Sequence, residues 1–357
     1  MKNIRFIKRG RCVIGLLAVL VFTACSDWTE VESVAINEAD IAKQNPALYA
    51  EYLENLRNYK KSEHKVMITW FNNSNKVPLS RADHIDVLPD SIDVVSLLHP
   101  ANPEQFELDE MEKVRSEKGT KFVYDMNFET IKLIYETMVA DMEANTPEEG
   151  EEGAAKPEIP AFVDFLADTV SRILPLVKKY SYDGIIVGYR GKNTLHMDEA
   201  EKQLYTTYEK AFIGIAEDWH ERNKDKMILF EGYPQNLLNK SILEKCRYII
   251  IPSMDAGNSA RLTYNIMSAN VEGVPSDRYI VSVETVSLDK EDVKTGYWAD
   301  GVTRAVTGAS QWVMLNHDGY SVAGLGIKNV NNDYFNIARI YPYTRDAISK
   351  MNPSPKK

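Results

Sequence analysis

The sequence predicts a single-domain (β/α)8 TIM barrel of the α/β class, and three features of the chain lead to this fold class. Eight short apolar runs rich in β-branched residues recur along the chain, and helical patterns lie between many of them. Several runs are apolar almost throughout, as parallel strands covered on both faces are. The length of the chain suits one large core, since a single α/β barrel commonly has about 250 residues or more. We therefore expect one closed parallel sheet within residues 45–357.

The individual elements follow from apolar periodicity and from end signals. Asn45 and Pro46 open the first helix, as an N-cap residue followed by proline at the first helical position. Strands are expected at residues 66–71, 92–98, 121–126, 184–189, 227–231, 248–252, 279–283 and 312–316. Helices are expected at residues 162–179, 199–223, 242–245, 259–269, 302–308 and 334–351. Residues 141–160, rich in glutamate, glycine and proline, predict an acidic loop inserted between the third and fourth strands.

The N-terminus carries an export signal. A basic start is followed by an apolar run at residues 13–22, too short to span a bilayer comfortably, and then by Thr23-Ala24-Cys25. Small residues leading to a cysteine indicate a lipoprotein signal. We expect residues 1–24 to be removed as a signal peptide, Cys25 to carry lipid, and residues 25–44 to tether the domain. Ser26-Asp27 with Glu30 fits surface export, so the expected location is the outer membrane, at the cell surface of a Gram-negative bacterium.

Charge and cysteine usage argue against several functions. Without residues 1–24 the chain has 37 basic and 52 acidic side chains, a net charge of −15 at pH 7. This balance argues against nucleic acid and anionic lipid as partners, but not against neutral sugars. Only Cys246 remains once Cys12 and Cys25 are accounted for, so no intramolecular disulfide is expected. Histidine spacings typical of metal sites and a glycine-rich phosphate loop after the first strand are both missing, so neither metal nor cofactor is predicted.

Polar and aromatic residues gather where the expected strands end. In a barrel of this kind the functional site lies at the C-terminal ends of the strands. Aromatic rings beside short polar groups match the surface of a sugar, whose apolar ring faces are edged by hydroxyls. The sequence therefore predicts an oligosaccharide or glycan ligand, with these contacts: Trp70, Asn72, Tyr124, Asp125, Tyr189, Arg190, Tyr233, Asp255, Glu284 and Asn316.

The fourth expected strand is the most informative segment. It reads Tyr182-Asp183-Gly184-Ile185-Ile186-Val187-Gly188-Tyr189-Arg190. Its opening resembles the signature strand D-G-x-D-x-D-x-E of glycoside hydrolase family 18, which includes chitinases and endo-β-N-acetylglucosaminidases. The passage at residues 64–71 looks like the start of the barrel in secreted lipoproteins related to that family, and Met254-Asp255 and Trp312 lie roughly where the family has comparable residues. The resemblance covers most of the mature chain in outline.

The same resemblance implies that family-type catalysis is lost. In the family, the last Glu of the motif protonates the glycosidic oxygen, and the Asp two residues before it orients the N-acetyl group that attacks the anomeric carbon. Asp183 is retained, but Ile186, Gly188 and Arg190 stand where the other three carboxylates belong. Arginine cannot donate a proton usefully, because its pKa lies above ~12. We therefore expect hydrolysis by this route to be abolished, and Asp183 to be a structural hydrogen-bonding group.

Three hypotheses about function stay open on these grounds. The first is a catalytically inactive family-18-like lipoprotein that binds glycans, by resemblance those containing N-acetylglucosamine, for a glycan-utilisation system with other surface proteins. The second is an active glycosidase that uses two other strand-end carboxylates, Glu231 and Glu284. The third is a scaffold subunit of a surface complex with no sugar site. Arg190 either hydrogen-bonds a sugar or closes the site through an ion pair with Asp125, Glu231 or Glu284.

Overall fold

The computed structural model describes residues 41–145, 158–336 and 338–353. The predicted signal peptide, the predicted lipidation site Cys25 and most of the predicted tether lie outside these residues, as do residues 146–157 of the predicted acidic loop. The chain divides into two compact units, Met1–Ala50 and Glu51–Lys357. The whole barrel belongs to the second unit. The C-terminal ends of its strands, which we call the mouth, therefore lie within one unit.

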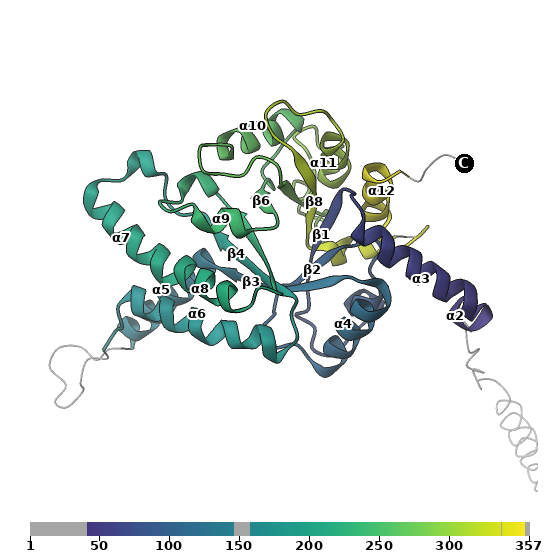
Figure 1. Cartoon of the computed structure of the whole chain (residues 1–357), viewed down its shortest axis with the longest axis horizontal. Helices are drawn as coiled ribbons and strands as arrows, with labels where there is room; N and C mark the ends of the chain where they lie inside the picture. Colours follow the sequence, from purple (N-terminus) through teal and green to yellow (C-terminus); the bar gives the residue numbers. More distant parts are fainter. Residues whose placement is uncertain (1–40, 146–157, 337, 354–357) are drawn as a thin grey trace, which may run out of the picture. The chain divides into compact units, whose positions relative to one another are not determined.

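Eight parallel strands close into a barrel in chain order, with β1 paired to β8. Figure 1 shows the strands at the centre of the second unit, with helices outside them. The predicted (β/α)8 fold class is therefore confirmed. The strands are β1 (Val66–Phe71), β2 (Val94–Leu97), β3 (Lys121–Asn127), β4 (Gly184–Tyr189), β5 (Met227–Gly232), β6 (Ile249–Pro252), β7 (Tyr279–Glu284) and β8 (Val322–Lys328).

The predicted helices between residues 162 and 269 are found, the helices at residues 105–118 and 128–144 were not predicted, and the last two helices begin later than predicted. Asn45 caps α3 as expected, because its Oδ1 accepts a hydrogen bond of 3.1 Å from the main-chain N–H of Leu48. The predicted helix at 199–223 is found as α7, a π-helical turn and α8. The longer helices are α3 (Pro46–Lys61), α4 (Gln105–Lys118), α5 (Phe128–Ala144), α6 (Phe162–Lys179), α7 (Glu199–Glu209), α8 (Ile215–Arg222), α10 (Ser259–Ala269), α11 (Ala305–Val313) and α12 (Pro342–Met351), and the short ones are α2 (Ile41–Gln44) and α9 (Ser241–Lys245).

Three predicted boundaries differ in the structure. The helix predicted at residues 302–308 is found at Ala305–Val313. Helix α5 continues through Ala144, so the first residues of the predicted acidic loop are helical. The helix predicted to begin at residue 334 begins at Pro342 instead, because Tyr341 adopts a left-handed conformation with φ of 53° just before it. None of the described helices is long and apolar enough to cross a membrane.

The prediction for the eighth strand was wrong. Residues 312–316 are not a strand, since Trp312 lies in α11 and β8 is formed by Val322–Lys328. Two glycines lower the β-strand propensity of the β8 segment, and the structure shows why glycine is required at both positions. A Cβ on Gly324 would lie 2.0 Å from the carbonyl oxygen of Val66 on β1, and a Cβ on Gly326 would lie 3.1 Å from the ring of Trp70. The strand that closes the barrel therefore needs glycine at both positions.

Strand side chains alternate between two apolar layers, and this alternation decides which residues reach the mouth. One layer fills the barrel interior and consists of Val66, Ile68, Trp70, Val94, Val123, Ile186, Leu229, Ile250 and Ile280. The larger layer lies between the sheet and the helices and includes Tyr124, Tyr182 and Tyr189. On each strand, the residue two positions after an interior residue also faces inward. Asp125 and Glu231 therefore face the interior at the C-terminal end of the barrel.

Candidate functional site

Four inward-facing residues from four strands form a connected group at the C-terminal end of the barrel, which we call the mouth cluster: Trp70, Asp125, Glu231 and Lys328. The indole N–H of Trp70 donates a hydrogen bond of 3.0 Å to Oδ2 of Asp125. Lys328 Nζ lies 2.7 Å from Oε1 of Glu231 and 3.5 Å from the centroid of the Trp70 ring. The lysine thus joins the carboxylate of β5 to the indole of β1.

Burial controls the electrostatics of the mouth cluster. Glu231 is only 6% exposed. Burial raises the pKa of its carboxyl, while Lys328 and, to a lesser extent, Arg190 act in the opposite direction. The negative charge of Asp125 adds to the rise. Oδ1 of Asp125 is buried and has no hydrogen-bond partner among the described residues. The cluster is therefore held together by an ion pair in a low-dielectric setting, with one acceptor left over.

The end of β4 contains no carboxylate. Ile186 belongs to the apolar interior. A Cβ on Gly188 would lie 2.5 Å from Nδ2 of Asn127 on the neighbouring strand β3. Asn127 is fixed there because it caps α5, accepting a hydrogen bond of 3.0 Å from the N–H of Thr130. The motif positions are therefore occupied by the apolar Ile186, by Gly188 and by Arg190. The amide of Asn127 from β3 flanks Gly188.

Arg190 stands at the rim with its main chain fixed and its side chain exposed. Its N–H donates to Oε1 of Glu129 at 2.7 Å, and its carbonyl oxygen accepts from Nδ2 of Asn236 at 2.7 Å. The guanidinium carbon lies 6.0 Å from the centroid of the Tyr233 ring. Across the described ranges the guanidinium forms no ion pair; the partner of Glu231 is Lys328 instead. Arg190 thus presents hydrogen-bond donors to solvent beside an aromatic ring.

Comparison with models of protein families assigns this barrel to a family. The model of glycoside hydrolase family 18, BT1044-like, matches residues 29–350. The chain belongs to glycoside hydrolase family 18. This agrees with the resemblance of its fourth strand, which the sequence indicated.

Two solved structures share the family 18 fold with this chain. A selenomethionine structure of a BT1044 variant is 15% identical, covers 87% of this chain and 95% of its own, and has a TM-score of 0.58. An endo-β-N-acetylglucosaminidase from Cordyceps militaris in its apo form is 14% identical, covers 85% of this chain and 96% of its own, and has a TM-score of 0.55. At these identities the likeness concerns the fold alone. The comparison with curated proteins finds no match.

Several predicted contacts of this family 18 chain lie on the rim. Tyr233 is 36% exposed, and the exposed Asp255 pairs with Arg261 at 3.0 Å. Glu284 accepts a hydrogen bond from Nδ2 of Asn329. Asn72 is exposed, and its main-chain N–H donates to Asn331 Oδ1 at 2.7 Å. These side chains remain candidate contacts for a ligand.

Four other predicted contacts are corrected by the structure. Tyr124 and Tyr189 face the layer between sheet and helices, where Tyr124 packs against the ring of Tyr182 at 5.6 Å and the Tyr189 hydroxyl donates to Glu209 at 3.2 Å. Asn316 lies in the connection from α11 into β8, at the opposite end of the barrel from the mouth. Trp70 is at the mouth but completely buried, so its ring supports Lys328 rather than offering a face to a ligand.

Asp183 takes the structural role expected of it. It precedes β4, at the end of the barrel opposite the mouth. Its Oδ2 accepts from the N–H of Phe122 at 2.9 Å and from Nε of Arg115 at 3.1 Å, and Lys121 Nζ lies 3.3 Å from Oδ1. The one motif carboxylate retained by this family 18 chain therefore ties β4 to β3 and α4, far from the site of catalysis in such barrels.

Lys328 and Asn127 were missed from the sequence. Lys328 was missed because β8 was assigned to the wrong segment. The signal that could have found it is the alternating run Leu325-Gly326-Ile327-Lys328, in which a lysine ends a strand on the interior side. Asn127 was treated only as a strand-end residue, and its position over Gly188 depends on the pairing of β3 with β4.

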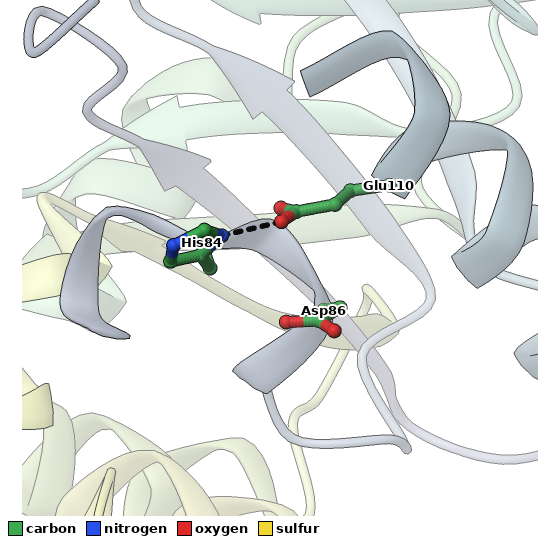
Figure 2. Close-up of side chains that lie close together, drawn as sticks. All are labelled: His84, Asp86 and Glu110. Atoms are coloured by element: carbon green, nitrogen blue, oxygen red, sulfur yellow. Dashed lines mark hydrogen bonds and ion pairs between the residues drawn. The ribbon is translucent and has the colours of Figure 1, made fainter. Parts of the chain in front are cut away.

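The described residues contain one group that could offer ligand atoms to a metal, away from the mouth. His84, Asp86 and Glu110 have ligand atoms within 4.8 Å of one another, on the side of the barrel where α4 packs (Figure 2). Several of their atoms already have partners: His84 pairs with Glu110, whose other oxygen accepts from the N–H of Ile85 at 2.7 Å. Oδ1 of Asp86 is buried and has no hydrogen-bond partner among the described residues. Lys113 lies 3.2 Å from Asp86. This ammonium group competes with a divalent cation, so we assign no metal to the group.

Proposed function

We propose that this family 18 protein binds a glycan at the mouth of its barrel and does not hydrolyse it. The observation that carries the proposal is the end of β4, where Arg190 follows Ile186 and Gly188, so that this strand offers no carboxyl group to donate a proton. An arginine there is permanently charged, and it offers five donors in a planar fork. It suits the recognition of hydroxyl, carbonyl or carboxylate oxygens of a sugar.

The surroundings of Arg190 support a carbohydrate ligand. Its guanidinium lies beside the partly exposed ring of Tyr233, and Asn72 and Glu284 lie at the ends of other strands. Aromatic faces next to fixed donors and acceptors are what sugar rings require. Family membership suggests glycans that contain N-acetylglucosamine. We further propose that the protein is a lipoprotein on the outer membrane and captures such glycans at the cell surface for an uptake system.

Replacing Arg190 by alanine should weaken glycan affinity by roughly 10- to 100-fold, since a hydrogen bond to a charged group contributes about 1.5–3 kcal/mol. The melting temperature should be unchanged, because the side chain is exposed. Calorimetric titration with a glycan selected on an array measures the change. Arg172→Ala, which removes an exposed arginine of α6 that pairs with Asp168 of the same helix, away from the mouth, is the matched control. Equal affinity of Arg190→Ala and wild type would remove Arg190 from the site, and an array without any bound glycan would favour the scaffold hypothesis.

Replacing Cys25 by alanine should move the protein from the membrane fraction to the soluble fraction. Acyl chains on that cysteine would supply the membrane affinity, at about 0.8 kcal/mol for each buried methylene. Detergent phase partitioning followed by immunoblotting measures the distribution. Cys12→Ala, within the predicted signal peptide, should remain in the membrane fraction. A Cys25→Ala protein that stays in the detergent phase would contradict the lipoprotein proposal.

A further inference from the structure

A hollow opens beside the mouth, between the loops that follow β4, β5 and β6 and the exposed side of α10. We call it the α10 groove. Its volume is about 580 Å³, and its lining includes Tyr233, Gln235, Asp255, Arg261, Tyr264 and Asn265. A volume of this order falls within the range of small-ligand sites, about 300–1,000 Å³. The groove is therefore large enough for a ligand the size of one or two sugar rings.

The α10 groove combines exposed aromatic rings with fixed polar groups. Tyr264 is 59% exposed, and the Arg261 guanidinium lies 5.0 Å from its ring centroid. The same guanidinium pairs with Asp255 at 3.0 Å, so one arginine holds both an aromatic ring and a carboxylate in place. Asn265 is oriented by a hydrogen bond of 3.1 Å to Ser253 Oγ. Apolar faces with donors and acceptors around them again match a sugar rather than an apolar helix or a phosphate.

A buried amide gives independent support for a polar occupant. Gln235, in the short 3-10 turn η5 (Pro234–Asn236) after β5, lines the groove. Its Oε1 is buried and has no hydrogen-bond partner among the residues that the structure describes. An unsatisfied buried acceptor costs about 1–3 kcal/mol. A small rotation of the amide toward the groove would let it accept a hydrogen bond from a ligand hydroxyl.

The groove and the mouth share one wall. Tyr233 lines the groove and also lies against Arg190, the residue proposed to contact a glycan at the mouth. A ligand that reaches from Arg190 past Tyr233 would enter the groove without leaving the surface. Two adjoining subsites act on one ligand with a high effective concentration, so occupancy of the first favours occupancy of the second.

We propose that the α10 groove is an accessory sugar subsite, so that the protein selects glycans long or branched enough to occupy the mouth and the groove together. This inference rests on the proposed function and specifies its ligand class: oligosaccharides rather than mono- or disaccharides. Tyr264 provides the platform for the distal sugar. Asp255, Arg261 and Asn265 bind its hydroxyls.

The test compares a short and a long ligand on matched variants. Chitobiose and chitohexaose are titrated calorimetrically against wild type, Tyr264→Ala, Arg261→Ala and Met267→Ala. Met267 is 63% exposed on the same helix and does not line the groove, so its variant is the control. We expect wild type to bind the long ligand about tenfold more tightly than the short one, and Tyr264→Ala and Arg261→Ala to lose most of that difference while their affinity for chitobiose stays within about twofold.

The outcomes separate this inference from the proposed function. Unchanged long-ligand affinity in both groove variants, with Arg190→Ala still impaired, would overturn the accessory subsite and leave the mouth intact. An equal loss for the short and the long ligand would show that the groove is part of the primary site, and would also overturn the proposal. If wild type binds neither ligand nor any other glycan on an array, the proposed function fails and the accessory subsite fails with it. Melting temperatures of the four proteins show whether each variant is folded.

Discussion

Replacing Lys328 by methionine should lower the free energy of unfolding by about 3–5 kcal/mol at pH 8, because it leaves the buried carboxylate of Glu231 without its counter-charge. Methionine has a similar length and removes the ammonium group, and with it the ion pair with Glu231 and the cation–π contact with Trp70. Lys328 Nζ lies 2.7 Å from Glu231, whose side chain is 7% exposed, so water cannot replace the lysine well. Urea unfolding at pH 8 measures the loss.

The effect should shrink in acid, and the sign follows from proton binding. Burial raises the pKa of Glu231 in the folded state, and loss of Lys328 raises it further. Between the unfolded and the folded pKa the folded protein binds more protons than the unfolded one, so stability falls as pH rises through that interval. Unfolding curves of Lys328→Met should therefore approach those of wild type as the pH is lowered from 8 to 5.

Two further proteins test the cause. Lys328→Met combined with Glu231→Met removes both charges, and it should regain most of the lost stability because an apolar pair of similar volume replaces a buried ion pair at little cost. Lys192→Met breaks the exposed pair with Glu201 and should leave the unfolding curve nearly unchanged. A single Lys328→Met variant as stable as wild type at both pH values would show that the pair contributes no net stability.

Wild-type protein should cleave chitobiose-type linkages at least about 10⁴-fold more slowly than a family 18 enzyme with an intact motif. A positioned proton donor alone contributes about 10²–10⁴-fold, and the group that orients the N-acetyl nucleophile is missing as well. Mass spectrometry of released glycan measures turnover. Enzyme-like turnover that disappears in Glu231→Gln or Glu284→Gln would contradict the prediction and establish the glycosidase hypothesis.

Reinstalling the motif tests whether the missing groups are the cause. Arg190→Glu alone should restore no turnover, since position 188 still lacks a carboxylate. Adding Gly188→Asp brings a Cβ to within 2.5 Å of the Asn127 amide as it stands, so the pair should remain inactive or fold poorly. Adding Asn127→Ala as well removes the amide and leaves the Cα of residue 127 at 3.2 Å from the new Cβ, a tight contact that a small shift relieves. At a cost of about 1 kcal/mol from the lost cap of α5, this triple variant should give the first measurable cleavage. Activity in Arg190→Glu by itself would show that position 188 is dispensable.

The structure also bears on the second and third hypotheses. Glu231 is held by Lys328 and Glu284 by Asn329, so both carboxylates of the alternative glycosidase already have partners at the mouth. Arg190, which would have closed the mouth in a scaffold, keeps its guanidinium free of ion pairs in the described part of the chain. The mouth cluster rather than Arg190 fills the interior at the C-terminal ends of the strands, and Arg190 and Tyr233 remain exposed at the rim.

Local sequence pattern was enough for most of the barrel. The predicted bounds of β1 and β4 agree with the structure because both strands are continuous apolar runs between polar turns. It failed for β8, where Gly324 and Gly326 are required by close approach of other strands and not by any local preference. The predicted contacts Tyr124 and Tyr189 were also wrong, because neighbouring residues of a strand face opposite sides of the sheet, and these two adjoin the inward-facing positions 125 and 190.

What the sequence by itself determined is the chemistry missing at the end of β4: no carboxyl group follows Asp183 in the motif, and no fold can supply one from Ile186, Gly188 and Arg190. Only the tertiary structure decided which groups meet at the mouth. The pair of Glu231 with Lys328 joins β5 to β8, and it exists because the barrel closes between β8 and β1. Closure is a non-local event that sets strand tilt and register together, so local patterns predict that a barrel forms but not which side chains its closure brings into contact.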